Sequence, residues 1–182
     1  INMMWYLDFN LWFNKKMRII LVFLMLKMSL FSSSLKIGED APNFILNDQD
    51  GKQHQLSDYK GKKLVIYFFP KAFTPGWTKQ ACGLRDIYSD FALNNISVLG
   101  VSYDSESKLS EFKEQYNLEF DLLSDSKKTM GELYDVNSFY FFPQRKTFLI
   151  DQNGVLVHII ESVNINSHAD DILAIFKKLK GV

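Results

Sequence analysis

The stretch "YFFPKAFTPGWTKQACGLRD", from Tyr67 to Asp86, indicates the fold more clearly than any other part of the sequence. An apolar run ends at Pro70, a short loop with a second proline and a glycine follows, and helical periodicity begins after Trp77. A loop that leads into a helix N-terminus suits an anion or an anionic nucleophile, because free backbone N–H groups converge there. An indole ring is neither, so the residue at position 77 conflicts with its surroundings.

Two continuous apolar runs flank the loop and the helix of this stretch. Leu64–Phe69 ("LVIYFF") and Ile96–Ser102 ("ISVLGVS") are typical of strands buried on both faces of a sheet. Between them, Thr78–Leu93 predicts a helix, since its apolar residues recur on one face. That buried stripe consists of Ala81, Leu84, Tyr88 and Phe91.

A second helix and a further strand follow along the chain. Ser105 can cap a helix, and the apolar side chains that share one face of that helix are Leu109, Phe112 and Tyr116. Asp121–Leu123 predicts a short strand, and another helix is expected near Lys127–Tyr134.

Turn signals predict a hairpin at each end of this unit. "NFIL" before Asp50-Gly51 and "HQL" after it indicate a small N-terminal β-hairpin. "KTFLI" (Lys146–Ile150) and "VLVHII" (Val155–Ile160) flank an Asn153-Gly154 turn and indicate a second hairpin.

A last helix closes the domain. Ser167, with Asp170 three residues later, forms a capping-box pattern at its start. Its predicted buried side contains Ile172, Ile175, Phe176 and Leu179. The whole order predicts an α/β, thioredoxin-like fold: a central mixed β-sheet flanked by helices, with an N-terminal β-hairpin.

Composition excludes several classes of function. The 182 residues carry 21 Lys+Arg and 21 Asp+Glu, so no basic excess supports nucleic-acid binding. Cys82 is the only cysteine, which excludes an internal disulfide and a thiolate zinc cluster. His54, His158 and His168 lack ligand spacing, so we expect surface or strand positions for them and no metal site.

The N-terminal region has the layout of a secretory signal. Lys15, Lys16 and Arg18 precede the apolar run Ile19–Leu26, and the small residues Ser32–Ser34 follow. This apolar run is much shorter than the ~20 residues that a membrane-spanning helix requires, so no stable membrane span is expected. An uncleaved anchor and a disordered leader are the alternatives.

These features divide the chain into three parts. Residues 1–16 have no convincing pattern and are interpreted as translated upstream sequence before Met17, or as a disordered leader. Residues 17–34 are the predicted signal peptide and residues 35–182 the single folded domain. Export implies a periplasmic location, whereas a true start at Met28 would imply a cytoplasmic one.

Several separated motifs resemble the peroxiredoxins, in the branch called bacterioferritin comigratory protein or Q-type peroxiredoxin. In the pattern Pro-x-x-x-Thr-x-x-Cys of that family, Pro70 and Thr74 match, and Trp77 stands at the position of the peroxidatic cysteine. Cys82, five residues later, matches the resolving cysteine, and Arg145 before "KTFLID" matches the catalytic arginine. The resemblance covers roughly residues 36–180 and includes "GEDAPNF" (Gly38 to Phe44) and "LLSD" (Leu122 to Asp125).

The resemblance implies reduction of hydrogen peroxide and organic hydroperoxides, without a metal or an organic cofactor. A thiolate attacks peroxide, and a helix N-terminus with the cation of Arg145 would lower the thiol pKa from about 8.5. Thr74 can hydrogen-bond the nucleophile or the peroxide, Pro70 can shield the nucleophile from water, and Cys82 can form a disulfide after local unwinding of the helix. The implied electron donor is a thioredoxin-like dithiol protein, and a monomer or weak homodimer is expected.

Trp77 leaves three interpretations open. It is a true substitution that makes the chain an inactive, partner-binding module; it is an error or an engineered change; or it marks a selenocysteine whose UGA codon was read as Trp. Trp5 and Trp12, the other two tryptophans, precede Met17, so the only Trp of the predicted domain stands at the nucleophile position. Taken literally, an indole cannot attack peroxide.

The aromatic segment Phe139–Phe142 ("FYFF") also allows two interpretations. It could wall a substrate pocket or a dimer contact, but ordinary core packing is the expectation.

Overall fold

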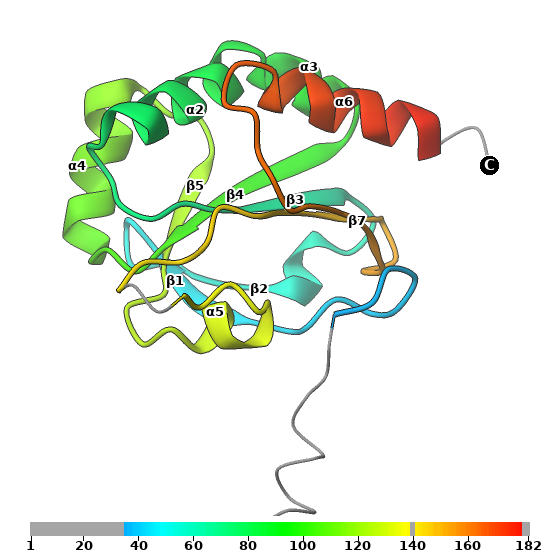
Figure 1. The fold of residues 1–182 in the computed structure, drawn as a ribbon, viewed down its shortest axis with the longest axis horizontal. Coiled ribbons are helices and arrows are strands. Elements are labelled where there is room, and N and C mark those ends of the chain that lie inside the picture. The colour runs from blue at the N-terminus through cyan, green and yellow to red at the C-terminus, as the bar shows by residue number, and fades with distance from the viewer. Residues whose placement is uncertain (1–34, 139–140, 180–182) are drawn as a thin grey trace, which may run out of the picture. The chain divides into compact units, whose positions relative to one another are not determined.

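The computed structural model describes residues 35–138 and 141–179, and the predicted leader and signal peptide lie outside this part of the chain. The described residues form one seven-stranded sheet in the order β2-β1-β5-β4-β3-β6-β7 (Figure 1). Its strands are β1 (Ile45–Asp48), β2 (Gln53–Gln55), β3 (Lys63–Phe68), β4 (Ile96–Ser102), β5 (Asp121–Ser124), β6 (Thr147–Ile150) and β7 (Leu156–Ile160).

Helices cover both faces of this sheet. In Figure 1, α2, α3 and α6 lie on one side of the central strands and α5 on the other. The helical elements are the 3-10 helix η1 (Leu56–Tyr59), α2 (Pro75–Asp86), α3 (Tyr88–Leu93), α4 (Glu106–Tyr116), α5 (Thr129–Leu133) and α6 (His168–Leu179). Within the part of the chain that the structure describes, no helix has both the length and the apolar character needed to cross a membrane.

The strand pairing explains why the sheet is mixed. β3 pairs with β4, and β4 with β5, in parallel, so helical crossovers must connect them. β6 pairs antiparallel with both β3 and β7, and β1 pairs antiparallel with β2. Both predicted hairpins are confirmed, and the glycines of their turns, Gly51 and Gly154, have positive φ angles of 78° and 91°. The predicted mixed sheet flanked by helices, with an N-terminal hairpin, is therefore correct.

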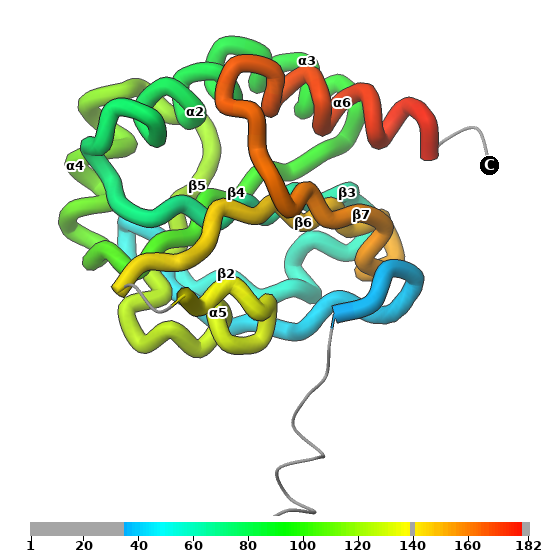
Figure 2. Tube along the Cα trace, viewed as in Figure 1, coloured from blue at the N-terminus to red at the C-terminus, as the bar shows by residue number. Residues whose placement is uncertain are grey.

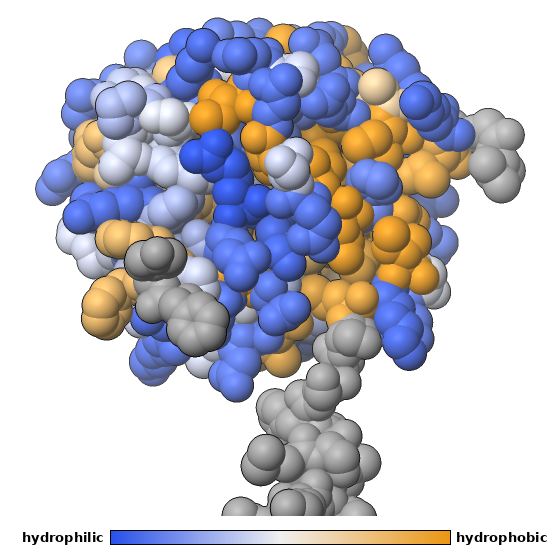
Figure 3. All heavy atoms as spheres, in the orientation of Figure 1, coloured by the Kyte–Doolittle hydropathy of each residue, from blue (hydrophilic) through white to orange (hydrophobic). Residues whose placement is uncertain are grey.

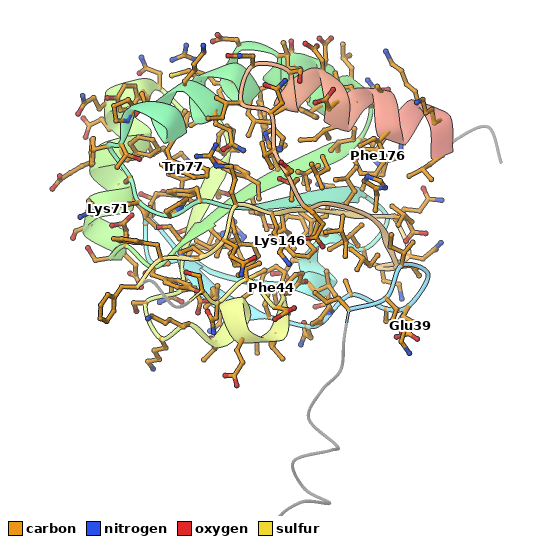
Figure 4. The ribbon with its side chains drawn as sticks, in the orientation of Figure 1. Glu39, Phe44, Lys71, Trp77, Lys146 and Phe176 are labelled. Carbon is orange, nitrogen blue, oxygen red and sulfur yellow. The ribbon has the colours of Figure 1, made fainter. Side chains whose placement is uncertain are left out.

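Two hydrophobic cores lie on opposite faces of the sheet, because β3 is buried on both. Val65, Tyr67 and Phe69 belong to the core shared with α2, α4 and α6, whereas Leu64, Ile66 and Phe68 belong to the core shared with α5. Figure 4 shows Trp77 and Phe176 on one side of the sheet and Phe44 on the other. The alternation of β3 thus directs Tyr67 and Phe69 toward the same core as Trp77.

The prediction of one helix over Thr78–Leu93 is wrong in its starting residue and in its continuity. It begins three residues earlier, at Pro75, and it breaks at Ile87, whose φ of −118° and ψ of 22° are not α-helical. The two pieces pack on different partners, since α2 contacts α6 and α3 contacts β4. The spacing of apolar residues does not reveal this change of partner, because Leu84 in α2 and Phe91 in α3 are both fully buried and continue the same apolar pattern.

Two expectations for the last helix are also wrong. The hydroxyl of Ser167 donates to Asp171 (2.8 Å) instead of pairing with Asp170 in a capping box. Leu179 is 40% exposed, because it stands at the end of α6 beside a surface cavity of about 480 Å³ lined also by Val157 and Phe176.

Core packing of the aromatic segment is wrong for its described part. Phe141 is 84% exposed and Phe142 40% exposed, while the first two residues of the segment lie outside the described residues. Lysine ammonium groups lie over both rings: Lys128 over Phe141 at 5.5 Å and Lys71 over Phe142 at 5.8 Å from the ring centroids.

Hydrophobic residues at the surface gather over β7 and the end of α6. Figure 3 shows them on the right-hand part of the face that is turned to the viewer. β7 is an edge strand, and its Val157, Ile159 and Ile160 are only half-buried.

Candidate active site

The loop after β3 and the first turn of α2 form the framework of the candidate site. Thr74 is the N-cap, with extended φ and ψ angles of −92° and 142°, and its carbonyl accepts from the N–H groups of Trp77 and Thr78 at 3.0 Å. Pro75 occupies the first helical position, where a missing N–H has little consequence. Position 77 therefore lies in the first helical turn, where the helix dipole favours negative charge.

Two features fix the shape of the loop. Phe73 has a positive φ of 66°, which is unusual for a residue with a bulky side chain. Its ring packs edge-on against Phe112 at 5.2 Å, which anchors it to α4. The N–H of Ala72 donates to the carboxylate of Asp104 at 2.7 Å, and Lys108 pairs with the same carboxylate. Contacts from α4 and from the residues just before it thus hold the loop in its strained conformation.

Arg145 and Trp77 lie face to face in the structure. The guanidinium carbon of Arg145 is 3.9 Å from the centroid of the indole, which is 5% exposed and also contacts the ring of Phe69. Among residues 35–138 and 141–179, the guanidinium has no hydrogen-bond or ion-pair partner, and the indole ring lies against it. Burial lowers the pKa of Arg145 from its ordinary value, although a guanidinium remains charged.

The other predicted site residues take different positions. Pro70 follows Phe69, two positions after the last residue of β3, and it is half-buried. The hydroxyl of Thr74 donates to the carbonyl of Lys71 at 3.1 Å, within its own loop. The structure thus brings Arg145 to position 77 and leaves the Thr74 hydroxyl bonded to its own loop.

Cys82 lies in the same helix as position 77, half-buried and with a free thiol. Five residues along an α-helix correspond to a rise of about 7.5 Å and to roughly 140° of rotation. The thiol therefore faces away from position 77 while α2 remains helical, as the sequence had led us to expect.

A buried polar cluster beneath the site was missed by the sequence analysis. His168, predicted to be a surface or strand residue, is the first residue of α6 and is 2% exposed. Its ring nitrogens lie 2.9 Å from Gln80 Nε2 on α2 and 2.9 Å from the Thr147 hydroxyl on β6. Since the amide nitrogen of Gln80 donates, the ring accepts at Nδ1 and donates from Nε2. The available signal was Gln80 itself, a polar residue three positions after Trp77 on the buried face of the helix.

Burial makes His168 a source of acid sensitivity. Burial, opposed by Asp171 and aided by the charge of Arg145, lowers the pKa of His168 to about 4. The unfolded chain binds a proton near pH 6.5 and the folded chain does not, so stability is full above that pH and is lost as the pH falls toward 4. The expected loss is about 3 kcal/mol in the free energy of unfolding.

Denaturant unfolding at several pH values tests this expectation. A His168→Asn variant, compared with the parent chain, should show a clearly smaller decrease in stability between pH 6.5 and pH 4. Equal decreases in the two proteins would show that other groups cause the acid sensitivity.

A second buried histidine lies far from this site along the sheet. The ring of His54 bonds Asp48 at 2.8 Å and the Tyr59 hydroxyl at 2.6 Å, and a carboxylate oxygen of Asp121 lies 3.9 Å away. These groups correct the expectation that the histidines are scattered, since three ligand-type atoms do meet. The ammonium of Lys113 already pairs with Asp121 at 2.7 Å. Although burial alone raises the pKa of Asp121, the hydrogen bond and charge of Lys113 leave it below its ordinary value. Lys113 thus already supplies a positive charge to this group of side chains.

Comparison with known proteins identifies the family to which this chain belongs. The family model described as "AhpC/TSA family" matches residues 37–159. The chain belongs to the AhpC/TSA family. Peroxiredoxin Bcp of Escherichia coli (strain K12) is 42% identical to this AhpC/TSA chain over 146 residues, which are 76% of the chain and 94% of that relative.

Solved structures agree with this assignment. Peroxidoxin BcpB from Mycobacterium tuberculosis is 33% identical and superposes with a TM-score of 0.75 over 80% of this chain and 98% of that one. The bacterioferritin comigratory protein of Xanthomonas campestris, studied for its alkyl peroxide reduction activity, is 29% identical, with a TM-score of 0.73 over 79% and 98% of the two chains. The thioredoxin-like fold and the resemblance to the Bcp and Q-type branch are therefore confirmed, and by family this AhpC/TSA chain is a peroxidase.

The side chain at position 77 of this AhpC/TSA chain is itself buried at the candidate site. Figure 4 shows Trp77 between α2 and the sheet, and its indole covers the Arg145 guanidinium. Three surface cavities of about 370, 480 and 380 Å³ are lined by other residues, and none of them includes Trp77, Arg145 or Thr74.

Proposed function

We propose that the chain is a thiol- or selenol-dependent peroxidase for hydrogen peroxide and organic hydroperoxides, with the residue at position 77 as nucleophile. The observation that carries the proposal is the Arg145 guanidinium, 3.9 Å from the centre of the side chain at position 77. Arg145 has no anionic partner within the described part of the chain, and an arginine so placed beside the first turn of a helix is suited to stabilise an anion at that position.

The proposed first step is a displacement on oxygen. A thiolate or selenolate at position 77 attacks one peroxide oxygen, the O–O bond breaks, and the departing oxygen takes up a proton to leave as water or an alcohol. Arg145 and the positive end of the α2 dipole stabilise the developing charge. Rotation about the Cα–Cβ bond of Thr74 would bring its hydroxyl from the Lys71 carbonyl toward the peroxide, and Pro70 would limit access of water.

The second step regenerates the nucleophile. The sulfenic or selenenic acid at position 77 condenses with the thiol of Cys82, which releases water and forms a disulfide or a selenenylsulfide. A thioredoxin-like dithiol protein then reduces this bond by exchange, and both residues return to their starting state.

We further propose that the natural residue at position 77 is selenocysteine. The only tryptophan in residues 35–182 stands at the nucleophile position, while Trp5 and Trp12 precede Met17. A selenol ionises more readily than a thiol, so the same surroundings would hold it as an anion at neutral pH. The nucleotide triplet at codon 77 decides the matter: UGA followed by a stem-loop supports selenocysteine, and UGG excludes it.

The Trp77 form itself favours a second function, binding without catalysis. Its indole is nearly fully buried and covers the guanidinium that a peroxide would need. Peroxide consumption with a thioredoxin system, measured for the Trp77 chain beside its Trp77→Cys variant, separates the two functions. Turnover only in the cysteine variant supports the peroxidase, and no turnover in either supports the binding module.

We propose export as the location of this activity, because residues 17–34 have the layout of a signal peptide. An exported peroxidase needs a dithiol reductant in the same compartment. Fractionation of cells that express the full chain tests this: recovery in the cytoplasmic fraction at full length would exclude export.

A further inference from the structure

Positions 77 and 82 cannot be joined while α2 is intact. Their Cα atoms are separated by a helical rise of about 7.5 Å, whereas a disulfide requires Cα atoms within about 6.8 Å of each other. The thiol of Cys82 also points about 140° around the helix from position 77. Formation of the bond therefore requires that the turn between the two residues unwinds, and whatever restrains that turn controls the step.

One side chain in this turn is hydrogen-bonded to another element of the described structure. Gln80 is 1% exposed, and its Nε2 donates to Nδ1 of His168 at 2.9 Å. His168 is the first residue of α6 and bonds Thr147 on β6 from its other ring nitrogen. The turn between positions 77 and 82 is thus tied through one hydrogen bond to a second helix and to the central sheet. Figure 2 shows α2 and α6 on the same side of the sheet, and the two helices are in contact.

The same side chain also has a buried acceptor that favours opening of the turn. The Oε1 atom of Gln80 is buried and, among the described residues, accepts no hydrogen bond. An unpaired buried acceptor is unfavourable, and water would satisfy it once the turn opens. One end of the amide therefore favours the closed helix, and the other favours the open one.

The segments beside this turn are held differently. Upstream, Gly76 lies under Ile165 and Arg145. Downstream, the guanidinium of Arg85 donates to the carbonyl of Tyr116 at 2.7 Å, which ties the end of α2 to α4. Both ends of α2 thus have contacts of their own, so we expect opening to begin in the turn that contains Gln80.

We propose that the Gln80–His168 hydrogen bond is a latch on this turn, and that the two side chains are positioning residues for the resolving step. The inference rests on the proposed function for its catalytic consequence, but the latch itself is a property of the Trp77 chain. Breaking the bond makes the turn open more often, and the sulfenic acid at position 77 then meets the Cys82 thiol more often, with loss of water and formation of the disulfide.

Hydrogen exchange in the Trp77 chain tests the latch without any catalysis. The amides from Thr78 to Cys82 should exchange about fivefold faster in Gln80→Ala, the effect of one lost hydrogen bond. The increase should be at least as large in His168→Ala, which also removes the bond to Thr147. In the double variant the increase should remain well below the product of the two single effects, since both remove the same bond. Independent, multiplying effects, or unchanged exchange in the single variants, would overturn the latch. Gln80→Asn, which keeps the amide but shortens its reach, provides the same test should an alanine variant fail to fold.

A catalytic measurement separates the latch from the function. In the Trp77→Cys background, one equivalent of hydrogen peroxide is added, and the loss of peroxide and the loss of the Cys82 thiol are followed separately by rapid quenching. Gln80→Ala should speed thiol loss about fivefold and change peroxide loss less than about twofold. Gln115→Ala, which removes an exposed glutamine from α4, is the matched control and should change neither rate.

Absence of any peroxide reaction would end the proposed function and leave the exchange result standing. An active peroxidase with an unchanged resolving rate would end the latch alone.

Discussion

The Trp77→Cys variant should consume peroxide at least about 10³-fold faster than the Trp77 chain, because removal of a catalytic nucleophile abolishes most of an enzyme's rate enhancement. The indole at position 77 has no lone pair able to attack oxygen, and it covers the Arg145 guanidinium at 3.9 Å. A cysteine supplies the nucleophile and vacates most of the volume of the indole. The measurement is the oxidation of NADPH in a coupled assay with thioredoxin, thioredoxin reductase and hydrogen peroxide.

A Trp77→Ser variant is the matched control, since it opens the same space without a sulfur atom. It should remain as inactive as the Trp77 chain. Equal activity of the serine and cysteine variants would mean that the opened pocket exposes a different nucleophile. Activity of the Trp77 chain itself would point to Cys82, which Cys82→Ser would then abolish.

Replacement of Arg145 has the second largest expected effect. In the Trp77→Cys background, Arg145→Gln should lower the rate constant for peroxide attack by about 10² to 10³-fold, the usual effect of losing one electrostatic stabiliser of a transition state. The guanidinium has no other partner among residues 35–138 and 141–179, so its removal leaves no broken ion pair to disturb the fold. Single-turnover rates of sulfenic acid formation provide the measurement.

Arg145→Lys distinguishes charge from geometry. It keeps the positive charge but loses the planar fork of donors, so it should recover only part of the activity. A decrease of less than about threefold in Arg145→Gln, at unchanged circular dichroism, would show that Arg145 does not stabilise the reaction.

Local pattern was sufficient to predict the framework of the site. The apolar run of β3, the proline that ends it and the loop into a helix all follow from neighbouring residues, whose preferences act over a few positions. The hairpins were equally accessible, because Gly51 and Gly154 supply the positive φ angles that their turns require. Arg145 was found through the family resemblance, since no local rule connects it to a residue 68 positions earlier.

Long-range pairings account for what the sequence did not reveal. Gln80 and His168 are 88 residues apart, and only the packing of α6 on α2 brings them together. His54 likewise meets Asp121 because β1 pairs with β5. The hydroxyl of Thr74 was expected at the nucleophile, but a loop carbonyl nearby offers it a closer partner. A buried polar residue on a helix face is the one sequence signal that points to such clusters.

The break between α2 and α3 has the same origin. Periodicity indicates which face of a helix is buried, but not whether one straight helix can reach both of its partners. The break follows from the geometry of α6 and β4, which contact α2 and α3 respectively.

The most direct test of the whole account is to find where oxygen is added. The Trp77→Cys, Cys82→Ser double variant is treated with one equivalent of hydrogen peroxide and a reagent that labels sulfenic acids, and its peptides are sequenced by mass spectrometry. The account predicts a label at position 77, lost when Arg145→Gln is added. A label that appears elsewhere, or no label at position 77 in a folded protein, would contradict it.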